Sequence, residues 1–146
     1  MQASYHHRQL SLPTVVSFIA MTAIFAVPFF FAGLHLILFA VLPPIFAFVA
    51  VVHWLLYSMT VEVSGHELRW YFGHGFWRKR IVLSNIARVE RVRLPRWYGI
   101  GIKYTPRAWV YLVAPGEGIE IRTVNGETVR IGTDDAERLM GALASR

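Results

Sequence analysis

The sequence predicts an α+β chain, in which an N-terminal transmembrane α-hairpin precedes a seven-stranded antiparallel β-sandwich or barrel capped by a C-terminal helix. Three observations predict this fold class. The 146-residue chain begins with a long stretch that lacks charged residues, the remainder consists of short apolar runs separated by turn residues, and a helix-capping pattern follows the last run. We therefore expect an N-terminal segment at residues 1–11, two membrane helices within residues 12–58 and one domain at residues 59–146.

The hairpin is predicted from charge and length. Between Arg8 and Glu62 the chain has no Asp, Glu, Lys or Arg, whereas helices of water-exposed domains need a polar face. A membrane-spanning helix needs about 20 apolar residues, and we place two such helices at about residues 12–32 and 36–58, with a tight turn at residues 33–35. Pro43-Pro44 has two interpretations: the pair kinks the second helix or starts it.

Charge also predicts the orientation of this hairpin. Arg and Lys flank the two spans but are absent between them, so the positive-inside rule places both termini in the cytoplasm. Trp54, Tyr57, Trp70 and Tyr71 suit the aromatic belt of that interface. The first apolar stretch exceeds the ~7–15 residues of a signal-peptide core, which argues against cleavage.

Short strands are predicted from residue 60 onward. Apolar runs and turn signals alternate here, which is typical of an antiparallel sheet. The predicted strands are residues 60–64, 68–72, 80–83, 99–104, 109–113, 119–124 and 128–131. The stretch 86–94 mixes two periods, which indicates a helical turn that leads into a bulged strand.

Two local patterns complete the predicted domain. Asn125-Gly126 favours a type I′ hairpin, because both residues tolerate positive φ. Asp134, followed three residues later by Glu137, is a capping box for a final helix, whose apolar stripe includes Leu139 and Leu143. An amphipathic helix at this place can close the open end of a curved sheet.

With these elements in place, the chain resembles bacterial pleckstrin-homology (PH)-like domain proteins. The resemblance lies in Val-Glu-Val at 61–63, Arg-Lys-Arg-Ile-Val-Leu at 78–83, Ile-Ala-Arg-Val-Glu at 86–90, Gly-Ile-Gly-Ile-Lys-Tyr-Thr-Pro-Arg-Ala-Trp-Val-Tyr at 99–111 and Arg-Ile-Gly-Thr-Asp-Asp at 130–135. In that group a hydrophobic hairpin commonly precedes one such domain. The resemblance implies a PH-like fold, and with the hairpin it implies a multi-pass protein of the bacterial cytoplasmic membrane. Its motifs are structural rather than catalytic.

Basic residues crowd one part of the predicted domain. Between residues 78 and 107 Glu90 is the only acid, and the net charge of the chain is +6. Basic side chains beside aromatic ones suit an anionic surface, although ordinary solvation also explains surface charges. The residues we expect to contact an anionic surface are Trp77, Arg78, Lys79, Arg80, Arg91, Arg93, Arg96, Trp97 and Arg107.

The sequence gives little support for catalysis, metals or cofactors. The absence of cysteine excludes thiolate chemistry. No Ser lies in a nucleophile elbow, His66 and His74 lack metal-ligand spacing, and capping explains Asp134-Asp135. His35 and His53 lie too far apart along the chain to share one ligand, so a turn histidine and a hydrogen-bonded histidine are the simpler interpretation. We expect no enzyme, no cofactor and no nucleic-acid partner.

Three functional hypotheses follow. The first is a membrane-anchored, non-enzymatic module that binds a protein partner, or anionic lipid head groups of the bilayer, through its sheet or edge strands. The second is an accessory subunit of a membrane protein complex, with the helix hairpin as the main contact. The third is a membrane-bound enzyme whose site lacks a known pattern.

Overall fold

The structure is a computed structural model that describes residues 5–31 and 36–145. Its helices are α1 (Leu12–Phe31), α2 (Leu36–Leu56) and α3 (Ala136–Ala144), with short 3₁₀ turns η1 (Leu83–Asn85) and η2 (Arg96–Tyr98). Its strands are β1 (Tyr5–Leu10), β2 (Ser58–Ser64), β3 (Glu67–Phe72), β4 (Trp77–Val82), β5 (Ile86–Leu94), β6 (Gly101–Thr105), β7 (Ala108–Leu112), β8 (Gly116–Thr123) and β9 (Thr128–Gly132). The predicted turn at residues 33–35, including His35, lies outside the described residues.

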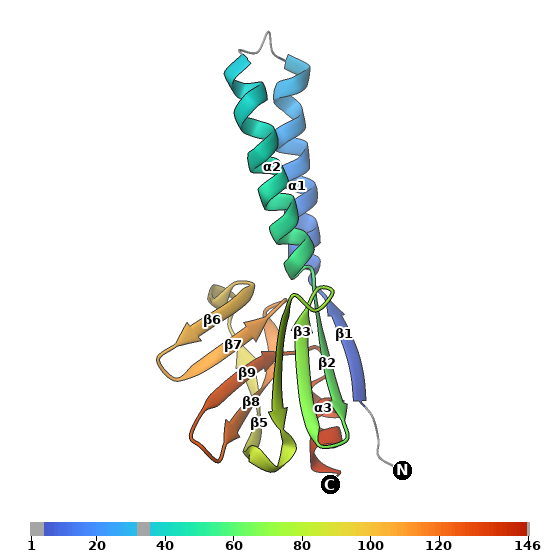
Figure 1. The fold of residues 1–146 in the computed structure, drawn as a ribbon, viewed down its shortest axis with the longest axis vertical. Coiled ribbons are helices and arrows are strands. Elements are labelled where there is room, and N and C mark those ends of the chain that lie inside the picture. Colours follow the sequence, from blue (N-terminus) through green and yellow to red (C-terminus); the bar gives the residue numbers. More distant parts are fainter. Residues whose placement is uncertain (1–4, 32–35, 146) are drawn as a thin grey trace.

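Helices α1 and α2 stand side by side on one end of a domain built from two sheets (Figure 1). Helix α2 starts at Leu36 and runs through Pro43 and Pro44, so the prolines do not start it. Ser17 on α1 and His53 on α2 join the two helices, with the Ser17 Oγ 3.0 Å from His53 Nε2, while His53 Nδ1 lies 2.8 Å from the Val49 carbonyl oxygen. His53 is therefore a hydrogen-bonded helix histidine.

The first sheet is an antiparallel meander in the order β1-β2-β3-β4. Its first strand was not predicted, because the sequence analysis assigned no element to residues 1–11. Strand β1 pairs with β2 over its whole length, from Tyr5 opposite Val63 to Leu10 opposite Ser58. Residues from both ends of the helical hairpin thus form neighbouring strands, which fixes the base of the hairpin to the domain.

The second sheet has the order β5-β8-β9-β7-β6. The prediction of seven antiparallel strands is wrong, because the described residues form a four-stranded and a five-stranded sheet and β7 pairs with β9 in parallel. The return of β9 between β7 and β8 produces this parallel pair, which the local sequence pattern does not indicate. Strand β5 covers the whole of residues 86–94 with a register shift between Ile86 and Arg88, which confirms the predicted bulged strand, whereas the helical turn η1 ends at Asn85, before this stretch.

The core lies between the two sheets and is closed by α3. Trp70 and Tyr111, one from each sheet, meet edge to face at 5.3 Å between ring centroids. Leu139 of α3 is fully buried in the same core. The predicted C-terminal helix is therefore present, but Asp135 occupies its N-cap and makes no side-chain capping bond, so the predicted capping box is wrong.

The prediction of a transmembrane hairpin is also wrong. Within residues 5–31 and 36–145, no helix combines the length and the apolarity that crossing a membrane requires. This finding overturns the transmembrane part of the predicted fold class, together with the multi-pass location in the bacterial cytoplasmic membrane and the cytoplasmic placement of both termini.

The ends of the two predicted spans also include or adjoin residues that are buried in the folded domain. Ser58, the expected end of the second span, begins β2 and is fully buried. Thr14, in the first turn of α1, is buried as well, and Ser11 just before it donates a hydrogen bond of 2.5 Å to the Val113 carbonyl oxygen. Trp70, expected in an interfacial belt, is a core residue with 2% exposure.

The predicted type I′ turn at Asn125-Gly126 differs in its backbone. Gly126 has a φ of 85°, but no residue other than glycine has a positive φ in the described chain. Thr123 donates its backbone N–H to the Glu127 carbonyl oxygen at 2.9 Å, and its own carbonyl oxygen accepts from Gly126 at 3.0 Å. The connection is thus a longer loop in which only the glycine takes the left-handed conformation.

Candidate anion-binding groove

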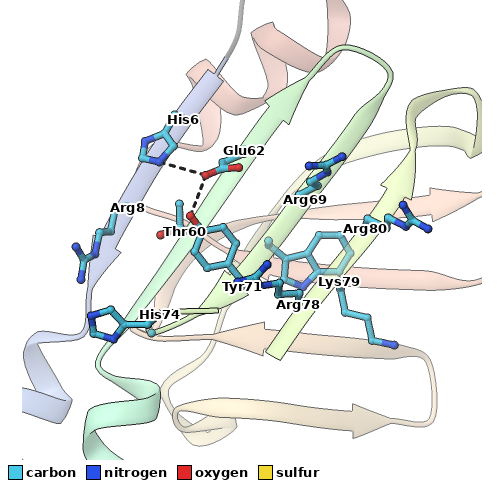
Figure 2. A pocket seen from close by; sticks show the side chains of 12 residues that line it. His6, Arg8, Thr60, Glu62, Arg69, Tyr71, His74, Arg78, Lys79 and Arg80 are labelled. Carbon is cyan, nitrogen blue, oxygen red and sulfur yellow. Dashed lines mark hydrogen bonds and ion pairs between the residues drawn. The ribbon is translucent and has the colours of Figure 1, made fainter. Parts of the chain in front are cut away.

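An open pocket of about 800 Å³ lies on the outer face of the first sheet, and we call it the β1–β4 groove. Its lining comes from all four strands and from the turn after β3. The lining residues are His6, Arg8, Thr60, Glu62, Arg69, Trp70, Tyr71, Gly73, His74, Arg78, Lys79 and Arg80. Figure 2 shows the β1 residues on one side of this groove, the β4 residues on the other and Tyr71 between them.

Strand periodicity explains why polar side chains gather here. Successive side chains of a strand point to opposite faces. On β2, Val61 and Val63 are buried in the core while Glu62 faces outward, and on β3 the buried Trp70 alternates with the partly exposed Tyr71. The same alternation that builds the core therefore places one row of polar residues from each strand on the groove face.

The floor of the groove is a hydrogen-bonded group centred on Glu62. The Tyr71 hydroxyl donates to a Glu62 carboxylate oxygen at 2.9 Å, and His6 Nε2 lies 3.3 Å from the same oxygen (Figure 2). Burial raises the pKa of the Tyr71 hydroxyl, and its hydrogen bond to Glu62 raises it further. Tyr71 therefore stays protonated and holds Glu62 in place.

Two groove cations are compensated by a neighbouring carboxylate. Arg69 Nη2 lies 2.7 Å from a Glu67 oxygen, and Arg80 Nη1 lies 3.6 Å from the other Glu67 oxygen. The hydrogen bond from Arg69 is the main cause that lowers the pKa of Glu67. Arg69 and Arg80 thus have a partner, which reduces their availability to a ligand.

Three further groove cations form no ion pair with a carboxylate of the described chain: Arg8, Arg78 and Lys79. Arg8 donates to the Tyr57 hydroxyl and lies over the Tyr57 ring, 5.4 Å from its centroid. Arg78 donates to the Gly75 carbonyl oxygen at 3.1 Å and lies 6.0 Å from the Tyr71 ring centroid. Aromatic and carbonyl contacts orient these guanidinium groups without neutralising them.

The structure separates the residues predicted from sequence to contact an anionic surface. Arg78, Lys79 and Arg80 line the groove. Trp77 precedes them on β4 and is 42% exposed, but it does not line the groove. These residues share one strand, so their closeness follows from the sequence alone.

The other predicted contacts lie away from the groove. Arg91 is bound by Glu117 at 2.6 Å and by Glu137 at 3.1 Å. Arg93 on β5, Arg96 and Trp97 on η2, and Arg107 in the turn between β6 and β7 are exposed, and none lines the groove. A run of basic residues in sequence thus divides between two sheets.

Sequence analysis missed the contribution of β1 to the groove. His6 and Arg8 alternate with the partly buried Tyr5 and His7, which is a strand pattern of only a few residues. His74, in the turn after β3, stacks on Trp54 of α2 at 5.2 Å between ring centroids. The charge-free helices separate β1 from β2 by more than forty positions, so only the fold brings Arg8 to Tyr71.

A second cluster of charged residues lies on the five-stranded sheet and is internally compensated. Glu120 on β8 has 5% exposure and accepts hydrogen bonds from Arg122 at 2.9 Å and from Arg130 at 2.8 Å. Burial alone would raise the pKa of Glu120, but the bonds from Arg130 and Arg122 outweigh it and lower the pKa. Each of these three groups thus has an oppositely charged partner, and removal of the buried carboxylate would leave two guanidinium groups without it.

Metal-ligating side chains do not gather in the part of the chain that the structure describes: it contains no group of three or more His, Cys, Asp or Glu residues suited to a metal ion. No family model, curated protein or solved structure matches this chain. The resemblance to PH-like proteins therefore stays a prediction, and the groove has to be interpreted from its own chemistry.

Proposed function

We propose that this protein is a non-enzymatic binding module whose β1–β4 groove holds an anionic group of a protein partner. The observation that carries the proposal is a pair of oriented guanidinium groups, Arg8 and Arg78, which have no carboxylate partner among the described residues. Unscreened like charges on one face repel one another, and an incoming anion removes that repulsion. A guanidinium pair with a fixed orientation suits carboxylate or phosphate groups, because its planar fork can bind two oxygens.

The chemistry of the groove favours binding over catalysis. Its carboxylate, Glu62, is held by Tyr71 and His6 at the floor. Its other polar side chains are the Arg and Lys cations, the Thr60 hydroxyl and the His74 imidazole, which stacks on Trp54. The groove is open rather than enclosed, as expected for a surface that accepts part of a larger molecule.

Binding of a fluorescein-labelled hexaglutamate peptide to the full-length chain tests this proposal by fluorescence anisotropy. The groove variant is Arg78→Gln/Lys79→Gln, and the matched control is Arg93→Gln/Arg96→Gln, which removes the same charge from exposed positions outside the groove. Each exposed charge contact contributes about 0.2–1 kcal/mol, so we expect the groove variant to weaken binding by roughly tenfold. We expect the control to change binding by less than about threefold, because salt screens the interaction between the peptide and charges outside the groove.

Two results would contradict the proposal. Equal losses in both variants would show attraction by net charge alone, without a site. Binding to vesicles of anionic phospholipid, with no binding of the peptide, would replace the protein partner by a lipid surface. Circular dichroism of all variants excludes unfolding as the cause of any loss.

A specific observation supports a second candidate, an accessory subunit whose helix hairpin contacts a larger complex. Large apolar side chains of both helices are exposed, among them Ile24 at 68% and Phe48 at 70%. Exposed apolar surface of this kind typically marks an interaction site. Replacement of both residues by Ser would then abolish co-purification with the complex and leave peptide binding by the groove unchanged.

A further inference from the structure

Strand β4 is the open edge of the first sheet, and the groove reaches it. Among the described residues it pairs with β3 alone, with Glu67 opposite Val82 at one end and Phe72 opposite Trp77 at the other. Trp77, Arg78, Lys79 and Arg80 are all exposed. The register between β3 and β4 has no shift, and β4 contains no proline. The side of β4 that faces away from β3 therefore presents a regular row of backbone N–H and C=O groups that another strand can pair with.

The charge on this edge decides what can pair with it. Two copies of β4 placed edge to edge would bring Arg78, Lys79 and Arg80 against the same three cations, which disfavours pairing of like charges. Edge strands of natural sheets use Lys and Arg to prevent such self-association. The same cations favour an incoming strand that carries acidic side chains.

The two faces of β4 set the spacing of those acids. Arg78 and Arg80 are two positions apart and line the groove, so they lie on one face of the strand. Cross-strand neighbours approach to about 4.5–5.5 Å between Cβ atoms. An added strand would therefore bring every second side chain to these two guanidinium groups. Arg80 and Arg69 share the Glu67 carboxylate, whereas Arg78 has no carboxylate partner in the described chain. The acid opposite Arg78 is therefore expected to contribute more to the affinity.

We infer that the open edge of β4 accepts an extended acidic segment of a partner protein as a fifth strand of the first sheet, with acidic side chains at alternate positions facing Arg78 and Arg80. This inference rests on the proposed function, because it names the form in which the anionic partner binds. Backbone hydrogen bonds to β4 would provide affinity, and the alternating acids would provide specificity. The residue that lies opposite Trp77, which is 42% exposed, is expected to be apolar.

The test keeps the protein unchanged and alters the peptide backbone, because a proline placed in β4 could simply unfold the sheet. The probe is a fluorescein-labelled octapeptide of alternating Glu and Val. Two derivatives carry N-methyl groups on the odd or on the even residues, which removes alternate N–H donors and leaves every side chain in place. In a strand only one of these sets faces β4, so one derivative should lose about tenfold or more in affinity, the effect of two or so lost backbone hydrogen bonds, and the other should lose less than about threefold.

The spacing of the acids is tested with an octapeptide of the same composition whose four Glu residues form one block. We expect it to bind about threefold to tenfold more weakly than the alternating peptide, because adjacent acids in a strand point to opposite faces. Equal affinity of both methylated derivatives and the parent would overturn strand addition. If Arg78→Gln/Lys79→Gln still weakened binding by roughly tenfold in that case, the groove proposal would stand, whereas failure of every acidic peptide to bind would overturn both.

Discussion

Replacement of Gly118 by Ala tests how tightly the second sheet is packed. Gly118 on β8 lies opposite Gly132 on β9. A Cβ atom at position 118 would lie 2.5 Å from the backbone carbonyl oxygen of Ile131 and 2.8 Å from Leu94 Cδ1. The carbonyl belongs to the neighbouring strand, so it cannot move away without distorting the pairing of β8 with β9.

The expected cost follows from that contact. Insertion of a methyl group into a well-packed region destabilises a protein by typically 1–3 kcal/mol, and we expect Gly118→Ala to reach about 3 kcal/mol because backbone, rather than a side-chain end, must shift. With a urea m-value of roughly 2 kcal/mol per M, the midpoint of urea unfolding would fall by about 1.5 M. Equilibrium unfolding followed by tryptophan fluorescence measures this midpoint.

Gly141 provides the matched control for this substitution. It lies in α3, and a Cβ atom there would have no neighbour within 4 Å. Gly141→Ala should raise the free energy of unfolding by about 0.5–1 kcal/mol, because alanine favours the helix over glycine. A Gly118→Ala protein whose midpoint matches the wild type, or exceeds that of Gly141→Ala, would refute the packing argument.

Three further substitutions test the charged clusters and the closing helix. Glu120→Gln removes the carboxylate that accepts hydrogen bonds from Arg122 and Arg130 and should lower the free energy of unfolding by about 2 kcal/mol at pH 7. The pKa of Glu120 is lowered in the folded state, so its contribution is present above about 4.5, its ordinary pKa, and is lost as the pH falls through the folded value. Urea midpoints measured from pH 7 to pH 3 should therefore fall more steeply for wild type than for Glu120→Gln, and parallel curves would contradict this assignment. Leu139→Ala leaves a cavity at a fully buried position of α3 and should lower the free energy of unfolding by about 2–5 kcal/mol, which thermal unfolding measures. A decrease below about 1 kcal/mol would mean that α3 does not close the core. Asp134→Asn replaces the carboxylate of an exposed 2.6 Å contact between Asp134 and His7 Nε2 and should change the free energy of unfolding by less than about 1 kcal/mol. A larger change would show that this contact anchors β1 to the domain.

The elements that depend on near neighbours in the chain could be predicted from the sequence. The bulged strand at residues 86–94 follows from a local change of period and is present as β5, while the helical turn lies just before this stretch as η1. The amphipathic pattern around Leu139 likewise predicts α3, whose buried side faces the core. The N-cap is Asp135 rather than the predicted Asp134, and the Asp134 carboxylate instead contacts His7, a residue from the other end of the chain.

The groove shows why local patterns were not sufficient for the candidate site. Arg78 and Lys79 could be found as a basic run, since they follow one another on β4. The sequence does not show that Arg69 and Arg80 share Glu67 while Arg8 and Arg78 have no carboxylate partner within residues 5–31 and 36–145, because these pairs depend on strand register. Availability to a ligand is a property of the assembled sheet.

Local sequence patterns were sufficient to predict two helices in the charge-free N-terminal region, the short strands that follow and a final helix that buries one apolar face, because propensity and periodicity act over a few residues. Three features could be seen only in the folded chain: residues 5–10 form the first strand of a sheet, β9 pairs in parallel with β7, and residues at both ends of the predicted spans pack in the domain. These features depend on pairing between segments far apart in the chain, whose stability comes from shared hydrogen bonds and a common core rather than from any local pattern.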